Sequence, residues 1–113
     1  DDTARLYRRS VNSANLYRKE AMAPELVDGW AIGPREVELA ACGTYFLREP
    51  RGEGDDLFPM LPTFTTPAEL GEQVRWALAH PDARADATCA ARAAIAGRTF
   101  RANAAELLRL IGA

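Results

Sequence analysis

The spacing of apolar and polar positions predicts that the chain begins with a short helix. Asp2 or Thr3 can cap this helix, because their side-chain oxygens accept hydrogen bonds from free backbone N–H groups. The helix is expected to run to about Arg9, with Leu6 and Tyr7 facing inward.

Short strands are expected after this helix. Residues 11–18 alternate with the side-chain period of a strand, and residues 44–47 form a short apolar run typical of a buried parallel strand. A third, brief strand is expected at 63–65. The segment 48–62 is predicted to be a long loop, because it carries charges and two glycines.

Start and stop signals delimit the other helices. Proline is favoured in the first turn of a helix and glycine just beyond the last, which predicts a helix over 34–42. The capping box at 66–69 starts a helix that ends at His80. Asp82 is expected to cap the next helix and Thr99 the last one. The last helix has an apolar face formed by Phe100, Ala104, Leu107, Leu108 and Ile111.

This order of elements predicts an α/β fold, in which a short parallel sheet is flanked by helices and the carboxy-terminal part is helical. The 113 residues are expected to form a single domain. Two or three strands are few for a free-standing sheet, so further strands are expected upstream or from a partner. An unpaired sheet edge would also allow a homodimer.

Composition excludes several classes of function. The formal net charge of −2 gives no basic excess for nucleic-acid binding, and no apolar run is long enough to span a membrane. Cys42, Cys89 and His80 follow no metal-ligand spacing, so no metal site is expected. Two buried, reduced thiols are typical of a cytoplasmic protein.

The segment 29–44 carries the most informative chemistry. It leads into a helix at the edge where the carboxyl ends of parallel strands meet, which is where α/β sheets bind ligands. Free N–H groups at the helix start suit a phosphate, and Arg35 can add a charged contact. Glu38 can accept hydrogen bonds from neighbouring hydroxyls such as those of a ribose. A helix start that binds no ligand explains the same residues. Glu36 and Glu38 are favoured near the positive end of the helix dipole, and Arg35 can pair with one of them.

Residues 35–44 (Arg-Glu-Val-Glu-Leu-Ala-Ala-Cys-Gly-Thr) resemble the R-x-x-E-x-x-A-C-G-T signature of GT-B glycosyltransferases. They are most similar to the group 1, spore-maturation-type enzymes. Further segments resemble the same family in the same order along the chain, namely 7–16, 55–58, 67–70, 80–81 and 99–101.

This resemblance implies a Rossmann-like half of a GT-B fold that holds a nucleotide-sugar donor, with neither a cofactor nor a metal. It implies that Glu38 binds the ribose hydroxyls and that Gly33, Pro34 and Arg35 lie beside the diphosphate. The expected partner is an N-terminal, acceptor-binding glycosyltransferase domain, in cis or in trans.

Arg18 and Lys19, after the first predicted strand, are further candidates for donor contacts that the motif does not fix. Many retaining members of the family carry a second glutamate upstream of the one matched by Glu38. Trp30 occupies that region here and the nearest acid is Asp28, so the stereochemistry of transfer is not assigned.

Two other classes of function fit the same pattern. One is a non-catalytic interaction or scaffold domain that retains the half-fold. The other is a different enzyme of this architecture, such as a nucleotide-sugar epimerase or a phosphorylase-like enzyme. For a donor-binding half, we expect the isolated chain to bind nucleotide weakly and to transfer nothing.

Overall fold

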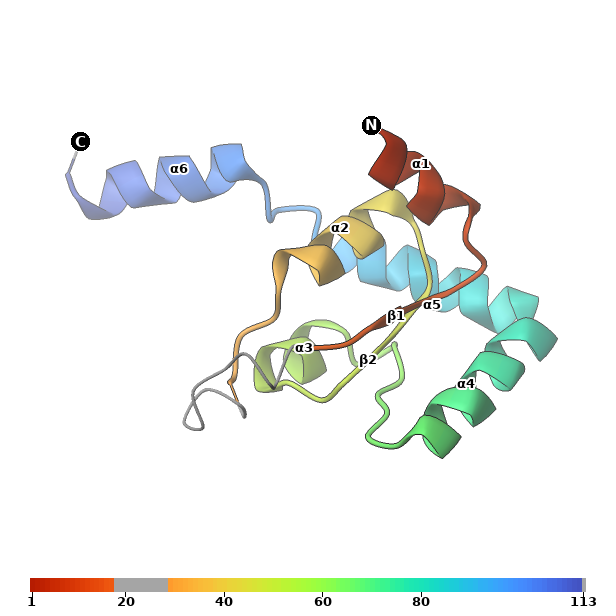
Figure 1. Cartoon of the computed structure of the whole chain (residues 1–113). Coiled ribbons are helices and arrows are strands. Elements are labelled where there is room, and N and C mark those ends of the chain that lie inside the picture. Colours follow the sequence, from red (N-terminus) through yellow and green to blue (C-terminus); the bar gives the residue numbers. More distant parts are fainter. Residues whose placement is uncertain (18–28, 113) are drawn as a thin grey trace.

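The computed structural model describes residues 1–17 and 29–112. Its elements, in chain order, are α1 (Asp2–Arg9), β1 (Ser13–Asn15), α2 (Pro34–Cys42), β2 (Phe46–Arg48), α3 (Gly52–Leu57), α4 (Pro67–Ala79), α5 (Pro81–Ala94) and α6 (Phe100–Leu110). The fold is α/β, as predicted: a short parallel sheet with helices around it and a helical carboxy-terminal part, consistent with half of a Rossmann-like fold (Figure 1).

The sheet is built around β2. Ser13 of β1 lies opposite Phe46, and Asn15 lies opposite Arg48, in parallel register. Arg48 also forms a parallel bridge to Thr63. The brief third strand expected here is therefore a single bridge, and β2 lies between it and β1.

Both strands differ from their predicted bounds. β1 is shorter than the strand predicted over 11–18, because the ladder has three residue pairs. β2 begins at residue 46 instead of 44. Thr44 belongs to the end of α2 instead: its N–H donates to the carbonyl of Leu39 at 3.0 Å, and its hydroxyl donates to the carbonyl of Tyr7 at 2.8 Å.

The prediction of a continuous loop over 48–62 was wrong, since the segment contains α3. Gly52 and Gly54 of α3 allow other side chains to come close to the helix backbone. A Cβ atom at Gly52 would collide with the indole of Trp30, and one at Gly54 would lie 2.8 Å from the Arg48 guanidinium. The glycines that suggested a loop therefore let two large side chains pack against a short helix.

His80 joins α4 to α5. It ends α4, where its N–H donates to the carbonyl of Trp76 at 3.0 Å, and its ring stacks on the Trp76 indole. The prediction of a helix-end role for His80 is confirmed. The predicted cap at Asp82 was wrong, because α5 begins at Pro81 with His80 as its N-cap.

The core gathers around β2 and the inward faces of the helices. Phe46 and Phe58 meet edge to face, with ring centroids 5.3 Å apart. The buried apolar residues are Leu39, Ala40, Tyr45, Phe46, Leu47, Phe58, Leu61, Phe64, Ala77, Ala91 and Ile95.

The first and last helices contribute little to this core. Tyr7 packs against it as predicted, but Leu6 is 65% exposed, so its predicted inward position was wrong. Thr99 caps α6 as predicted, by accepting the N–H of Ala102 at 3.0 Å. However, α6 has no buried residue and projects away from the other elements, so its apolar face is exposed (Figure 1).

Candidate functional site

The carboxyl ends of β1 and β2 carry a cluster of buried and partly buried polar side chains. Tyr17 follows β1, and Arg48 and Arg51 lie at and just after the end of β2. Glu36 joins them from the first turn of α2. In a parallel sheet these ends share one edge, so residues up to 34 positions apart in sequence meet there. We call Tyr17, Glu36, Arg48 and Arg51 the edge cluster.

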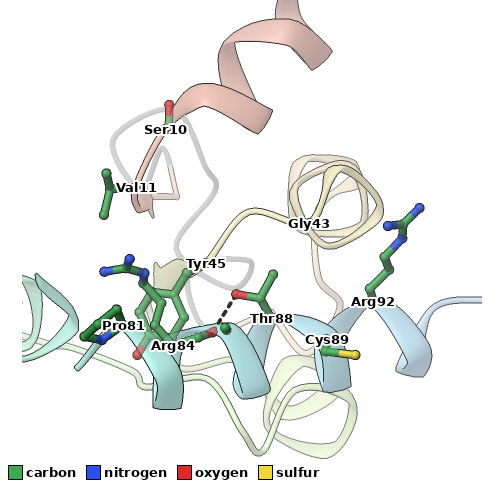
Figure 2. Close-up of a pocket in the computed structure, with 10 residues that line it drawn as sticks. Ser10, Val11, Gly43, Tyr45, Pro81, Arg84, Thr88, Cys89 and Arg92 are labelled. Atoms are coloured by element: carbon green, nitrogen blue, oxygen red, sulfur yellow. Dashed lines mark hydrogen bonds between the residues drawn. The ribbon is translucent and has the colours of Figure 1, made fainter.

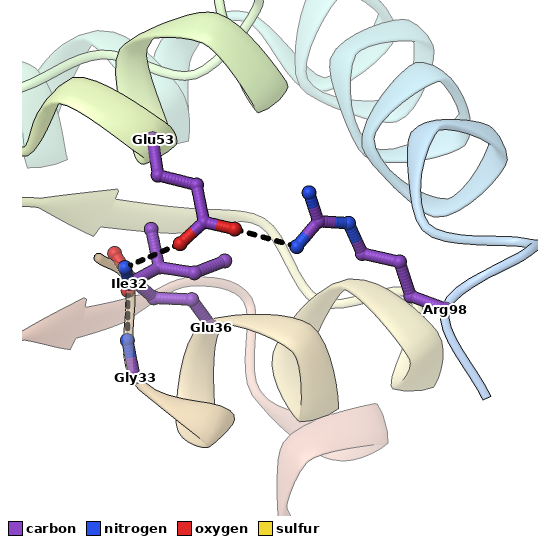
Figure 3. A network of polar contacts seen from close by, with 5 residues as sticks. All are labelled: Ile32, Gly33, Glu36, Glu53 and Arg98. Atoms are coloured by element: carbon purple, nitrogen blue, oxygen red, sulfur yellow. Dashed lines mark hydrogen bonds and ion pairs between the residues drawn. The ribbon is translucent and has the colours of Figure 1, made fainter. Parts of the chain in front are cut away.

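Glu36 closes the start of α2. It is fully buried, and its Oε2 accepts the N–H of Gly33 at 3.0 Å and the hydroxyl of Tyr17 at 2.6 Å. Figure 3 shows the carboxylate turned back toward Gly33. Its other oxygen, Oε1, is buried and has no hydrogen-bond partner in the described part of the chain. The carboxylate thus uses one of the backbone donors that a bound anion would otherwise take.

Tyr17 connects the two strands and α2. Its N–H donates to Oε2 of Glu49 at 2.8 Å, while its hydroxyl donates to Glu36. Burial is the largest cause that raises the pKa of the Tyr17 hydroxyl far above its usual value, and the hydrogen bond to Glu36 and the charge of Glu36 add to it. Tyr17 therefore stays protonated and remains a hydrogen-bond donor.

Arg48 is fully buried and paired. Its Nη1 lies 2.8 Å from Oδ1 of Asp55, an ion pair rather than a well-aligned hydrogen bond. Asp55 itself is half exposed. Asp55 belongs to α3, which places it beside the last residue of β2.

Arg51 differs from Arg48 in having no acidic partner among the described residues. Its guanidinium lies over the Tyr17 ring, 4.0 Å from the ring centroid, and the residue is 7% exposed. Nη2 is buried without a hydrogen bond, and no ion pair to Arg51 occurs among residues 1–17 and 29–112. A buried guanidinium in this state is costly, since its charge is taken out of water without compensation.

A second polar network ties the loop before α2 to α3. Oε2 of Glu53 accepts the N–H of Ile32 at 2.9 Å, and Oε1 pairs with Arg98 at 2.7 Å (Figure 3). The hydrogen bond from Arg98 is the largest cause that lowers the pKa of Glu53, followed by that from Ile32. Trp30 lies against Gly52 with its side chain 62% exposed. These contacts hold the approach to α2 in place.

The residues predicted to contact the diphosphate lie at the start of α2. Gly33 is the N-cap, and Pro34 is the first helical residue. Arg35 is exposed. Arg18 and Lys19 lie outside the described residues, as does Asp28.

Glu38 lies apart from these residues. It is exposed and, with Tyr7 and Cys42, lines a cavity of about 340 Å³ between α1 and α2. Glu36, two residues earlier, points to the edge cluster instead. Glu38 and the amino end of α2 therefore have different surroundings, although the motif places them in one binding site.

The larger hollow shown in Figure 2 is at the other end of the sheet. It has a volume of about 440 Å³ and lies between α5, which contributes Arg84 and Thr88, and the residues before the strands, including Val11 and Tyr45. Burial raises the pKa of the Tyr45 hydroxyl. Because this hollow is at the amino ends of the strands, it is separate from the edge cluster.

Sequence analysis missed every member of the edge cluster. Glu36 was explained by the helix dipole alone, and Tyr17 was treated as one position of an alternating strand. Arg48 and Arg51 were assigned to a loop. The available signal was the presence of an aromatic residue and two arginines directly after the two short strands, where α/β sheets place ligand contacts.

In the described part of the chain, no group of three or more His, Cys, Asp or Glu side chains could hold a metal ion. Within the same residues, no helix is long and apolar enough to cross a membrane.

Comparison with protein families identifies the class of this protein. The family described as "Glycosyl transferase-like" matches residues 1–109. The chain therefore belongs to this family and carries a glycosyltransferase domain, with a general role in glycosyl transfer. Searches of curated proteins and of solved structures gave no significant match.

Proposed function

We propose that the chain is the carboxy-terminal, donor-binding half of a GT-B glycosyltransferase of the group 1, spore-maturation type. In this proposal it binds a nucleoside-diphosphate sugar, and an N-terminal domain, in cis or in trans, binds the acceptor. The proposal rests on the family match over residues 1–109, and the polar groups at the carboxyl ends of two parallel strands support it.

The proposed donor contacts lie at the amino end of α2 and one turn further along the helix. Gly33, Pro34 and Arg35 are assigned to the diphosphate, and Glu38 to the ribose hydroxyls. Glu38 and Arg35 are both exposed, so a ligand can reach them from solvent. Arg18 and Lys19 are proposed as additional contacts.

The proposed reaction places negative charge on the leaving group. The bond between the anomeric carbon and the terminal phosphate oxygen breaks, and its electron pair stays on that oxygen. The acceptor oxygen forms the new bond to the anomeric carbon and loses its proton. Fixed positive groups beside the phosphate stabilise this charge without a metal or a cofactor.

Titration with nucleotides tests the proposal directly. UDP, GDP and ADP would each be added to the labelled protein, and backbone amide shifts would be followed by NMR. We expect one nucleotide to shift amides near Gly33, Arg35 and Glu38. Glu38→Ala should weaken binding, whereas Glu72→Ala, on the exposed face of α4, should leave it unchanged.

A lack of response to all three nucleotides at millimolar concentration would contradict donor binding. That result would favour the non-catalytic scaffold. A response confined to residues lining the hollow of Figure 2, such as Arg84 and Thr88, would also contradict the proposed location.

A further inference from the structure

Arg51 is the feature of the edge cluster that the fold does not explain. Its side chain is nine-tenths buried, yet its Nη2 atom makes no hydrogen bond in the described part of the chain, and its guanidinium lies over the Tyr17 ring. Buried arginines in proteins are normally paired with acids, as Arg48 is with Asp55.

Two carboxylates bind Tyr17, the residue whose ring Arg51 covers. Glu36 accepts the hydroxyl of Tyr17, and Glu49 accepts its N–H. Both acids therefore reach the same tyrosine, one through its side chain and one through its backbone, while the guanidinium occupies the ring face.

The amino end of α2 offers few free hydrogen-bond donors to an anion. Its first residue is a proline without an N–H, and the N–H of Gly33 is already bonded to Glu36. The carboxylate of Glu36 also opposes the positive end of the helix dipole. Few backbone donors are thus left for an anion at this edge, and Arg51 is a buried cation without an acidic partner among the described residues.

We propose that Arg51 binds a phosphate of the donor through its unpartnered Nη2, and that Tyr17 is the positioning residue that holds the guanidinium in place. This inference rests on the proposed function, because it takes the anion to be the donor's diphosphate. The tyrosine ring orients the planar guanidinium without consuming any of its N–H donors, which leaves them for a phosphate.

A structural role and a ligand-binding role for Arg51 predict opposite changes in stability for the variant Arg51→Met. If Arg51 is a packing residue, Arg51→Met removes useful contacts and lowers the unfolding temperature. If it is kept for a ligand, the same change removes an uncompensated buried charge, and the ligand-free protein becomes more stable. Methionine has a similar length and packs well on an aromatic ring.

The experiment measures affinity and stability of the same variants. Calorimetry gives the dissociation constant of UDP, GDP and ADP, and thermal unfolding is followed without nucleotide. For the nucleotide that the wild type binds, we expect Arg51→Met to weaken binding by about tenfold or more, or about 1.4 kcal/mol. The unfolding temperature should rise by about 2–5 °C. Arg101→Met, which removes the same charge from exposed α6, should change neither quantity.

Variants of Tyr17 test the positioning role. Tyr17→Phe keeps the ring and should retain nucleotide affinity, although it loses the hydroxyl contact to Glu36. Tyr17→Leu removes the ring face and should weaken binding about as much as Arg51→Met. Equal affinities for the two variants would overturn the assignment of Tyr17.

The outcomes separate this inference from the function on which it rests. If the wild type binds a nucleotide and Arg51→Met binds it equally well, the role of Arg51 is overturned and donor binding stands. A lower unfolding temperature for Arg51→Met would show that Arg51 is a packing residue, and would also overturn its proposed role in phosphate binding. If the wild type binds none of the three nucleotides, both proposals fall.

Discussion

The edge cluster and α6 depart from ordinary protein architecture in opposite ways. At the carboxyl ends of the strands, Glu36, Arg48 and Arg51 carry charge into the interior. Phe100, the first residue of α6, is 94% exposed, and Ile111, which follows the last residue of α6, is 66% exposed. One region buries polar groups, and the other leaves apolar groups in water.

The difference shows that burial and stability are distributed unevenly in this fold. Edge-cluster residues are tied to both strands, α2 and α3, so a change in one of them acts on the whole domain. The residues of α6 are held by local hydrogen bonds, including the cap at Thr99. Changes there are expected to act on that helix alone. Matched substitutions in the two regions, taken from the largest expected effect to the smallest, test this contrast.

The largest effect is expected for Glu36→Ala. It leaves the Tyr17 hydroxyl and the Gly33 N–H without their acceptor, and an unsatisfied buried donor costs about 1–3 kcal/mol. We expect a loss of about 2–4 kcal/mol in the free energy of unfolding, measured by urea denaturation. Glu38→Ala, on the exposed side of the same helix, should change it by less than about 0.5 kcal/mol. Equal losses would contradict the separation of the two glutamates.

The caps of α4 and α6 give a matched pair of intermediate size. Thr66 accepts the N–H of Glu69, and Thr99 accepts that of Ala102. Thr66→Ala should lower the free energy of unfolding by about 1 kcal/mol, because α4 packs on the core. Thr99→Ala should reduce helical content without shifting the main unfolding transition. A shift as large as that of Thr66→Ala would show that α6 unfolds together with the domain.

Acid pH should affect the two regions differently. Hydrogen bonds from Arg98 and Ile32 lower the pKa of Glu53, and the hydrogen bond from Arg109 lowers that of Glu106 on α6. A carboxyl with a lowered folded-state pKa contributes stability above its unfolded pKa of about 4.3 and loses it as the pH falls through the folded value.

We therefore expect Glu53→Gln to flatten the decline in domain stability below about pH 4.3, relative to the wild type. Glu106→Gln should leave that decline unchanged, because α6 is not coupled to the core. Unfolding measured across the acid range checks both variants. An unchanged decline in Glu53→Gln would show that its ion pair with Arg98 adds no stability.

The smallest effect is expected on the apolar face of α6. Leu107 is 59% exposed, so Leu107→Gln should change the free energy of unfolding by less than about 0.5 kcal/mol. Leu70→Gln, on the face of α4 that packs against the core, should lower it more. A large loss in Leu107→Gln would mean that α6 packs against the domain in solution.

The helices were the most predictable part of the fold. The predicted helix over 34–42 and the helix that follows Thr66 are confirmed, because proline, capping residues and glycine act within a few residues of the helix ends. The strand bounds and α3 were not predictable in this way. β1 ends where its pairing with β2 ends, and Gly52 and Gly54 allow contacts that come from Trp30 and Arg48.

The predicted contacts at Gly33, Arg35 and Glu38 came from a continuous motif, and their roles stay predictions. The edge cluster could not be found in that way, since its members come from three separate segments of the chain. What distinguishes Arg51 is that it has no acidic partner among the described residues, and this becomes visible when those residues are placed in three dimensions.

The amino-acid sequence by itself determined the α/β class, the main helices and the family, because periodicity, caps and motifs are local properties of the chain. The tertiary structure alone decided which glutamate of α2 is buried, which arginine is paired and which apolar face stays in water. These properties depend on contacts between residues far apart in sequence, because a side chain becomes buried or paired through the neighbours that folding brings to it.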